Sequence, residues 1–372
     1  MESPQRARST SEVRCAEYCV LSHPLIELSN EKAVRQAAEF KNAAAELTPE
    51  RLTEAYAAER NDAPRVHEGG RTYFVKRSGK PATERRKNKD EEHLGAALVR
   101  ASGENGHELP DDLGRLHILD YQVRAKTGPA DEPATKGISR FDLIGVTSEG
   151  RLVVVKLRYL EPTATRCRVG DTPLRQLLEG LAYTAIAEAN REDIAGEIAE
   201  RFGKTISDEP PMLIVAASPR YWELCRKRAT QKGAAWIKEI DRIVADAPEA
   251  IGVPVHFMSV RLDKDPGWIY GAEGPELDGN SRLLPAWEPG AGKIKPKPRP
   301  RPRARTEPEN VIVEADLSRP VRSYSFSDSY AAGDRIEHAK LGTGVVQGTA
   351  GPGKIRVHFD ERHSVLIHER SA

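Results

Sequence analysis

The chain has 372 residues, a length that accommodates two or three domains. Its 38% hydrophobic and 30% charged residues are polar for a single compact body, which indicates that part of the length lies outside a core. The longest apolar run, Met212–Ala217, is far shorter than the roughly 20 residues of a membrane span, and the N-terminus does not resemble a secretory signal. Four cysteines are too few for a disulfide-stabilised fold of this length. We therefore expect a soluble, cytoplasmic protein that does not act at a membrane.

The net charge of +1 conceals an uneven distribution. From Lys293 to Arg305 the sequence KIKPKPRPRPRAR carries seven basic residues and no acidic one, and subtracting these seven from +1 leaves −6 for the remaining chain. We call this segment the basic strap; its cations are Lys293, Lys295, Lys297, Arg299, Arg301, Arg303 and Arg305. It could contact DNA phosphates, lie in a minor groove, or act as a solvated spacer. The charge density favours phosphate contact.

Residues 1–81 are predicted to form a mostly helical N-terminal region. Ser29 or Asn30 would cap a helix that runs to about Leu47, and Pro49 would begin a second one, because proline is tolerated in the first helical turn. The sequence of this region suggests no chemistry.

Residues 82–289 change to a mixed α/β pattern. Helices alternate with strands that are apolar on both faces, which predicts a central sheet covered by helices on both sides. The expected elements are a charged helix from about Thr83 to 102, strands over 115–125, 141–146 and 151–160, a helix over 172–189, a strand over 212–218, further helices, and a strand over 253–262.

The hairpin formed by residues 141–160 contains the most informative pattern. If Ser148–Gly150 form a three-residue loop with Gly150 left-handed, Ile144 lies opposite Val154 and Asp142 lies opposite Lys156. A carboxylate and an ammonium group facing each other among buried β-branched residues are costly, so the pair indicates either a functional site or a structural ion pair at the rim of the sheet.

These residues resemble the PD-(D/E)xK restriction-endonuclease-like superfamily over roughly 82–262. The resemblance implies a restriction-endonuclease-like central mixed sheet flanked by helices. It also implies a phosphodiester hydrolase in which Asp142 binds Mg²⁺ and Lys156 activates the attacking water. The second metal ligand of the family would fall at position 154, where this sequence has Val154, and valine cannot bind a metal.

Two glutamates on neighbouring helices are candidates for the missing ligand. Glu91 lies on the buried stripe of the helix that precedes the strands, although it could instead be an acid favoured by the helix dipole. The sequence EGLAY places Glu179 and Tyr183 on one face of the following helix and resembles the Q-h-x-x-Y element of RecB-like nucleases. Glu179 would then be a metal ligand that has moved to the helix; otherwise it belongs to a polar face beside the leucine stripe.

Residues 290–330 are expected to form a disordered, basic, proline-rich linker, and residues 331–372 a small C-terminal β-barrel. The pattern of Gly333, Asp334, His338, Gly342 and Gly344 resembles the Tudor-like module of UvrD-type repair helicases and CarD-type transcription regulators. That resemblance implies an SH3/Tudor-like barrel that binds RNA polymerase, another protein or nucleic acid and carries out no chemistry.

Two functions remain open from the sequence. The first is a divergent, Mg²⁺-dependent, nuclease-like enzyme acting on DNA in repair, defence or a transcription-coupled process. The second is a catalytically inactive adaptor with a nuclease fold that binds nucleic acid or RNA polymerase. Val154 favours the adaptor, and the pairing of Asp142 with Lys156 favours the enzyme.

Overall fold

The computed structural model describes residues 23–75, 82–126, 137–227, 235–264, 266–288, 312–360 and 362–369. These residues fall into two compact units, 23–288 and 312–369, which we describe separately. Within the described ranges, no helix is both long and apolar enough to cross a membrane.

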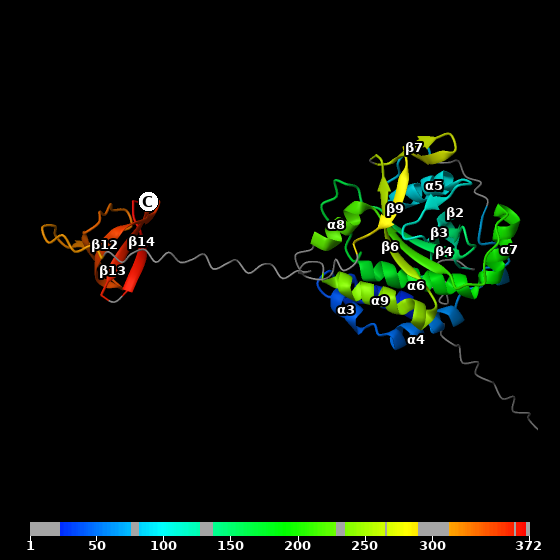
Figure 1. Cartoon of the computed structure of the whole chain (residues 1–372), viewed down its shortest axis with the longest axis horizontal. Coiled ribbons are helices and arrows are strands. Elements are labelled where there is room, and N and C mark those ends of the chain that lie inside the picture. The colour runs from blue at the N-terminus through cyan, green and yellow to red at the C-terminus, as the bar shows by residue number, and fades with distance from the viewer. Residues whose placement is uncertain are drawn as a thin grey trace, which may run out of the picture. The chain divides into compact units, whose positions relative to one another are not determined.

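The first unit is built on a mixed sheet of seven strands in the order β1-β2-β3-β4-β5-β6-β9 (Figure 1). The first four strands are antiparallel neighbours, β4, β5 and β6 are parallel, and β9 returns antiparallel to β6. The strands are β1 (His107–Glu108), β2 (Arg115–Arg124), β3 (Arg140–Thr147), β4 (Leu152–Arg158), β5 (Met212–Ala217), β6 (Val255–Leu262) and β9 (Ser281–Pro285). The α/β class expected from the sequence is therefore present.

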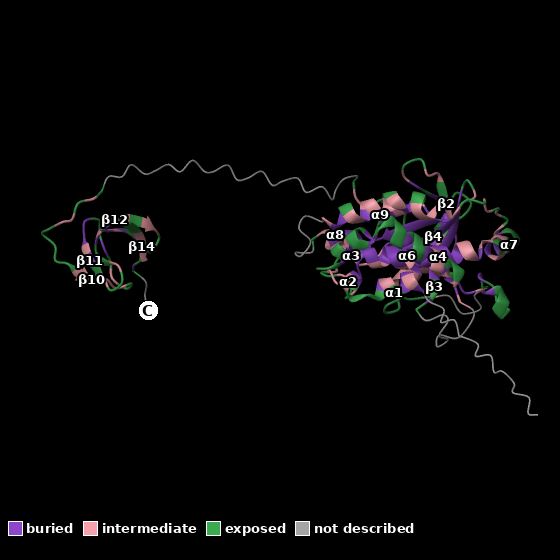
Figure 2. Ribbon diagram, turned by 90° about the horizontal axis from the view of Figure 1, so that it is seen from below, coloured by how far each residue is buried: buried purple, intermediate pink, exposed green. Residues whose placement is uncertain are grey.

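Helices cover both faces of this sheet, and each face has its own hydrophobic core. On one face, α6 (Pro173–Ala189) and α9 (Trp236–Ile251) pack with the N-terminal helices, and α7 (Arg191–Phe202) and α8 (Pro219–Lys227) add side chains to the same core. On the other face, α5 (Asp90–Ser102) packs beside the hairpin of β7 (Trp268–Gly271) and β8 (Gly274–Leu277). Figure 2 shows α6 as a buried helix between its neighbours.

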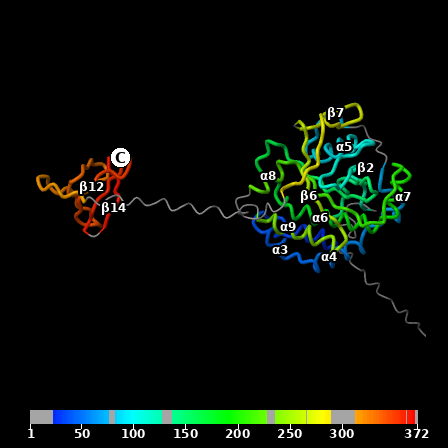
Figure 3. The backbone as a smooth tube through the Cα atoms, in the orientation of Figure 1, coloured from blue at the N-terminus to red at the C-terminus, as the bar shows by residue number. Residues whose placement is uncertain are grey.

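The N-terminal helices share this core instead of forming a region of their own. They are α1 (Pro24–Asn30), α2 (Lys32–Arg35), α3 (Phe40–Glu46) and α4 (Pro49–Asn61), followed by the short 3₁₀ helix η1 (His67–Gly69). Phe40 is fully buried and its ring centroid lies 5.7 Å from that of Trp236 on α9. The tube in Figure 3 shows α3 and α4 beside α9, although they are far apart in sequence. Residues 23–75 are thus an integral layer of the α/β unit.

Helix α5 begins at Asp90, which corrects the expected start near Thr83. Asn88 has a positive φ of 61°, a backbone conformation that cannot continue a right-handed helix, and Lys89 has non-helical angles. The charged residues before Asn88 are helix formers by composition, but the described residues 82–89 form turns and bends instead of a helix. Glu91 therefore lies in the first turn of α5.

The second unit is a five-stranded sheet in the order β10-β11-β12-β13-β14 around a small core that includes Tyr330 and Phe359. Its strands are β10 (Arg322–Ser323), β11 (Arg335–His338), β12 (Gly342–Gly351), β13 (Lys354–Phe359) and β14 (Arg362–Ile367). Residues 312–330, expected to belong to a loose linker, pack against this sheet. Tyr330 is 6% exposed and Gln347 bonds both backbone groups of Val313, so the unit begins before residue 331. Residues 289–311, which include the basic strap, lie outside the described residues.

Candidate functional site

The β3–β4 hairpin has the register predicted from its turn. Gly150 has a φ of +89°, and Ile144 pairs with Val154. Asp142 and Lys156 lie one residue beyond the last paired positions of the two strands, and Asp142 Oδ2 accepts a hydrogen bond of 3.0 Å from the backbone N–H of Leu157. The side chain of Asp142 thus accepts the hydrogen bond of a β4 backbone N–H just beyond the last paired residues of the ladder. This bond holds its carboxylate beside β4.

Glu179 reaches the same place from α6. Thr172 caps this helix by accepting a hydrogen bond from Arg175 N, and its hydroxyl donates to the carbonyl of Val34 at 2.6 Å. Gly180 follows Glu179, and a Cβ at this position would lie 2.8 Å from Leu213 Cδ1 on β5. The absence of a side chain at residue 180 therefore allows α6 to pack closely on the sheet, and this packing brings Glu179 to the end of β4.

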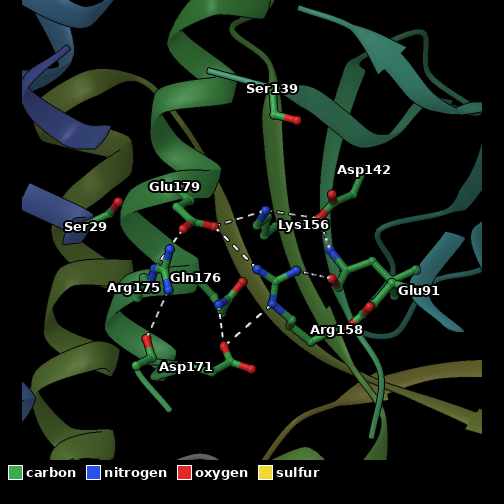
Figure 4. Close-up of polar contacts among 12 residues, drawn as sticks. Ser29, Glu91, Ser139, Asp142, Lys156, Arg158, Asp171, Arg175, Gln176 and Glu179 are labelled. Carbon is green, nitrogen blue, oxygen red and sulfur yellow. Dashed lines mark hydrogen bonds and ion pairs between the residues drawn. The ribbon is translucent and has the colours of Figure 1, made fainter. Parts of the chain in front are cut away.

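The ammonium group of Lys156 lies between two carboxylates (Figure 4). Its Nζ is 3.2 Å from Asp142 Oδ2 and 3.1 Å from Glu179 Oε2. The Lys156 side chain is only 9% exposed, so the ion pairs are shielded from solvent. The structure therefore brings together three of the residues predicted from the sequence, Asp142, Lys156 and Glu179.

Two arginines that the sequence analysis missed complete the charge balance. Arg175 Nε lies 2.8 Å from Glu179 Oε1, and Arg158 Nη2 lies 3.5 Å from Glu179 Oε2. Burial alone would raise the pKa of Glu179, but the charges of Lys156, Arg158 and Arg175 outweigh it and lower the pKa below the usual 4.5. Spacing could have revealed both arginines, since Arg158 lies two residues after Lys156 on a strand and Arg175 lies one helical turn before Glu179.

A buried layer behind the site holds Arg158. Asp171 Oδ1 lies 3.6 Å from Arg158 Nε and accepts a hydrogen bond of 2.6 Å from Gln176 Nε2. Burial would lower the pKa of Arg158, but nearby carboxylates, Asp142 first among them, hold it above its usual value. Arg158 therefore stays charged and links Asp171 to Glu179.

Tyr183 belongs to the site as a packing group. Its ring lies under the ammonium group of Lys156, with Nζ 5.6 Å from the ring centroid, a favourable cation–π arrangement. Its hydroxyl accepts a hydrogen bond of 2.9 Å from the backbone N–H of Ser139. Burial raises the pKa of Tyr183 well above its usual value, so the phenol keeps its proton at neutral pH.

These residues line a cavity of about 350 Å³. Its walls carry Asp142, Lys156, Glu179 and Tyr183, and also Gln122, Arg140 and Arg175. Helix α1 supplies a further wall through Ile26, Ser29 and Asn30, so the N-terminal region, to which the sequence analysis gave no role, contributes directly to the candidate site. Concavity and converging polar groups are features of binding and catalytic sites, although this lining is more charged than that of most small-molecule pockets.

Glu91 does not join this cluster. It lies on α5, on the opposite face of the sheet from α6. Its carboxylate oxygens are 3.5 Å from Tyr159 N and 3.8 Å from Arg168 Nη1, and it does not line the cavity. The structure therefore does not bring Glu91, expected to be a metal ligand or catalytic group, together with the other predicted site residues. Its place in the first turn of α5 explains the acidic residue through the helix dipole.

Val154 is part of the hydrophobic core. It is 1% exposed and belongs to the core beneath α6. The position that would carry the family's second metal ligand therefore fills space between the sheet and the helix.

The donor atoms partly match what Mg²⁺ requires. Asp142 and Glu179 are hard oxygen donors that face one point beside a cavity, and Mg²⁺ is usually held by one or two carboxylates together with water. Asp142 Oδ1 makes no hydrogen bond or ion pair among the residues that the structure describes. Lys156 Nζ, however, occupies the point on which the two carboxylates converge. Across the described residues, no group of three or more His, Cys, Asp or Glu side chains is arranged to hold a metal.

Three comparisons with known proteins give no relative. No family model, no curated protein and no solved structure matches the chain.

Proposed function

We propose that the unit of residues 23–288 is a divergent, nuclease-like domain of the PD-(D/E)xK type that acts on DNA phosphodiesters. The observation that carries this proposal is the convergence of Asp142, Lys156 and Glu179 on the wall of one cavity. These three residues come from two strands and a helix, and the sequence pattern predicts all three. Convergence of this kind is much more specific than any of the separate motifs.

The residues have distinct roles in this proposal. Lys156, held between two carboxylates, presents a cation to the phosphoryl oxygens and orients the attacking water. Asp142 and Glu179 would hold Mg²⁺, which supplies charge stabilisation and lowers the pKa of a bound water. Arg158 and Tyr183 position Lys156 and Glu179 from behind. Metal binding requires the Lys156 ammonium to move away from the point between the carboxylates, so we expect weak metal affinity in the absence of DNA.

A second candidate function is a nucleic-acid or protein adaptor with no catalysis. Two observations favour it: Val154 is buried in the core, and three cations already neutralise Glu179 and Asp142. In this case the cluster is a structural ion network, of the kind that holds a sheet and a helix together.

DNA cleavage in the presence of Mg²⁺ or Mn²⁺ separates the two functions. We expect Asp142→Asn, Lys156→Gln and Glu179→Gln each to lower the cleavage rate by about 100-fold or more. Glu200→Gln, an exposed position on α7, is the matched control and should keep the wild-type rate. Equal residual cleavage in all four variants would refute the site. DNA binding without cleavage in the wild type would establish the adaptor.

A measurement that does not depend on cleavage tests the metal. We expect calorimetric titration with Mn²⁺ to show binding to the wild type and none to Asp142→Asn. Identical titrations of both proteins would show that these carboxylates do not hold the ion.

We propose that residues 312–369 form a Tudor-like recognition module for RNA polymerase or another protein. Edge strand β14 exposes Val365 and Ile367, which are 57% and 41% exposed, and an exposed apolar edge is a surface suited to a partner. The basic strap would contribute DNA contacts, and the small number of cysteines, four in 372 residues, agrees with a cytoplasmic setting. Co-sedimentation of RNA polymerase with the full chain, but not with a Val365→Glu variant, tests the module.

A further inference from the structure

A second cavity, of about 690 Å³, lies next to the candidate site and has a basic lining. The loop between β4 and α6 supplies Arg166 and Arg168, the end of α2 supplies Arg35, and the end of α8 supplies Lys227. No acidic residue lines this cavity. We call it the arginine pocket.

The arginines of this pocket are available to a ligand. Arg35 and Arg166 are exposed and form no ion pair among the described residues. Arg168 is 53% exposed and has only a long contact of 3.8 Å with Glu91. Lys227 is different, because its ammonium is paired with Glu223 on the same helix. Three arginines therefore gather at the pocket with only the one long carboxylate contact of Arg168 among the described residues, and a bound anion would reduce their mutual repulsion.

An exposed apolar side chain lies among these cations. Val169, between Arg168 and Gly170, is 96% exposed, more than any other exposed large hydrophobic residue of the described chain. Polar binding of a small ion would leave Val169 in water. A ligand that presents both phosphates and apolar surface, as the sugars and bases of a nucleic acid do, would cover it.

One glycine connects the arginine pocket to the candidate site. Gly170, which has a φ of +76°, lines the arginine pocket, and a Cβ on it would lie 2.8 Å from Arg35 Nε. The carbonyl of Gly170 accepts a hydrogen bond of 3.3 Å from Arg175 Nη1, and Arg175 lines the candidate site. The two cavities are thus neighbours on either side of this contact.

The geometry points to the arginine pocket as a binding site for the phosphates of the DNA strand that flanks the reacting phosphodiester. This inference deepens the proposed function and rests on it for the identity of the strand. Arg35, Arg166 and Arg168 bind backbone oxygens, and Val169 packs against a sugar or base. The pocket then holds the strand while Lys156 faces the neighbouring phosphodiester.

Fluorescence anisotropy of a labelled single-stranded oligonucleotide, and of its duplex, tests the inference on the full chain. EDTA in the buffer prevents cleavage, and each affinity is measured over a series of salt concentrations. The test variant is Arg35→Gln/Arg166→Gln/Arg168→Gln. The control, Arg51→Gln/Arg201→Gln/Arg282→Gln, removes the same charge from exposed arginines outside the pocket. Equal thermal midpoints of the variants exclude misfolding.

We expect the pocket variant to bind at least 10-fold more weakly at low salt. Its slope of log affinity against log salt should fall by about 2 for single strands, since each lost phosphate contact removes about 0.7. The control variant should stay close to wild type. Equal slopes for the two variants, or a wild type that does not bind DNA, would overturn the inference. Weaker binding by the pocket variant without cleavage by the wild type would keep the pocket and refute the proposed nuclease. If Lys156→Gln abolishes cleavage and the pocket variant binds DNA as tightly as the wild type, the proposed nuclease is supported and the arginine pocket is refuted.

Discussion

Lys156 on β4 and Glu179 on α6 form an ion pair of 3.1 Å across the interface between the sheet and the helix. Asp142 shares the same ammonium group, whereas Glu179 is also paired with Arg158 and Arg175. Removing one partner of a buried ion pair usually costs more than the pair itself contributes, because the remaining charge is left uncompensated. Substitutions in this cluster are therefore expected to lower the stability of the fold as well as the proposed activity.

The cluster contributes to the way in which the free energy of unfolding depends on pH. Replacement of Lys156 by methionine should change the sign of this contribution. In the wild type the lowered pKa of Glu179 stabilises the fold above pH 4.5, and this stability is lost as the pH falls further. In Lys156→Met, Arg158 and Arg175 still compensate Glu179, but the two carboxylates lose the ammonium group between them, and protonation then reduces their mutual repulsion. We expect a loss of about 3 kcal/mol at pH 7.5 that becomes smaller at pH 5.

Urea unfolding at the two pH values measures this difference, and Lys156→Arg, which keeps the positive charge, is the control. A loss of stability in Lys156→Met that is larger at pH 5 than at pH 7.5 would contradict the described geometry.

Gly145 on β3 should not tolerate a side chain. A Cβ there would lie 2.6 Å from the carbonyl oxygen of His117 on β2, and this contact is with backbone that cannot swing away. We expect Gly145→Ala to lower the free energy of unfolding by about 1–3 kcal/mol, as overpacking usually does. Gly196→Ala is the matched control, because a Cβ at that position of α7 meets nothing within 4 Å. The control should gain up to about 1 kcal/mol from helix propensity. Equal thermal midpoints of the two variants would show that β2 and β3 are not this close.

The first unit should lose stability as the pH falls through 6.5. Burial lowers the pKa of His93, His107 and His256 below this usual value. The unfolded chain then binds more protons than the folded one, so the free energy of unfolding decreases toward pH 5.5. His67 acts in the opposite direction, because a hydrogen bond to Glu197 raises its pKa, but its imidazole is 39% exposed and partly screened by solvent.

Tryptophan fluorescence isolates this effect, since all 4 tryptophans of the chain fall within residues 222–287. His107→Gln should show a shallower pH dependence than the wild type. A free energy of unfolding that is constant from pH 7.5 to 5.5 in the wild type would refute the prediction.

The basic strap should contribute most of the salt dependence of DNA binding. Its seven cations in the sequence from Lys293 to Arg305 could release up to seven counterions. Replacing all seven by glutamine should lower the slope of log affinity against log salt by as much as about 5 on single strands, measured by the same anisotropy titration. A slope unchanged from wild type would assign the strap to the role of a spacer. Additive effects of this variant and the arginine-pocket variant would show that the two sites bind independently.

The sequence was sufficient to predict the hairpin register and the pairing of Asp142 with Lys156. Both depend on the local geometry of a short turn and on the two-residue period of a strand. Glu91 could not be placed in the same way, because the positive φ of Asn88 moved the start of α5 and the helix packs on the other face of the sheet. Local spacing places Arg158 on the Lys156 face of β4 and Arg175 one turn before Glu179, but the packing of α6 on β4, which joins these two pairs into one cluster, is a tertiary contact that no local pattern contains.

Helix α1 forms part of the wall of the cavity but supplies none of the charged residues of the cluster. A protein that began at residue 31 would retain Asp142, Lys156 and Glu179, yet it would lack Ile26, Ser29 and Asn30. Its charges would then stand on an open, water-filled surface, where attraction between them is screened and a bound strand has nothing to enclose it. The first helix of the fold is thus the part of the molecule that turns a group of charges into an enclosure.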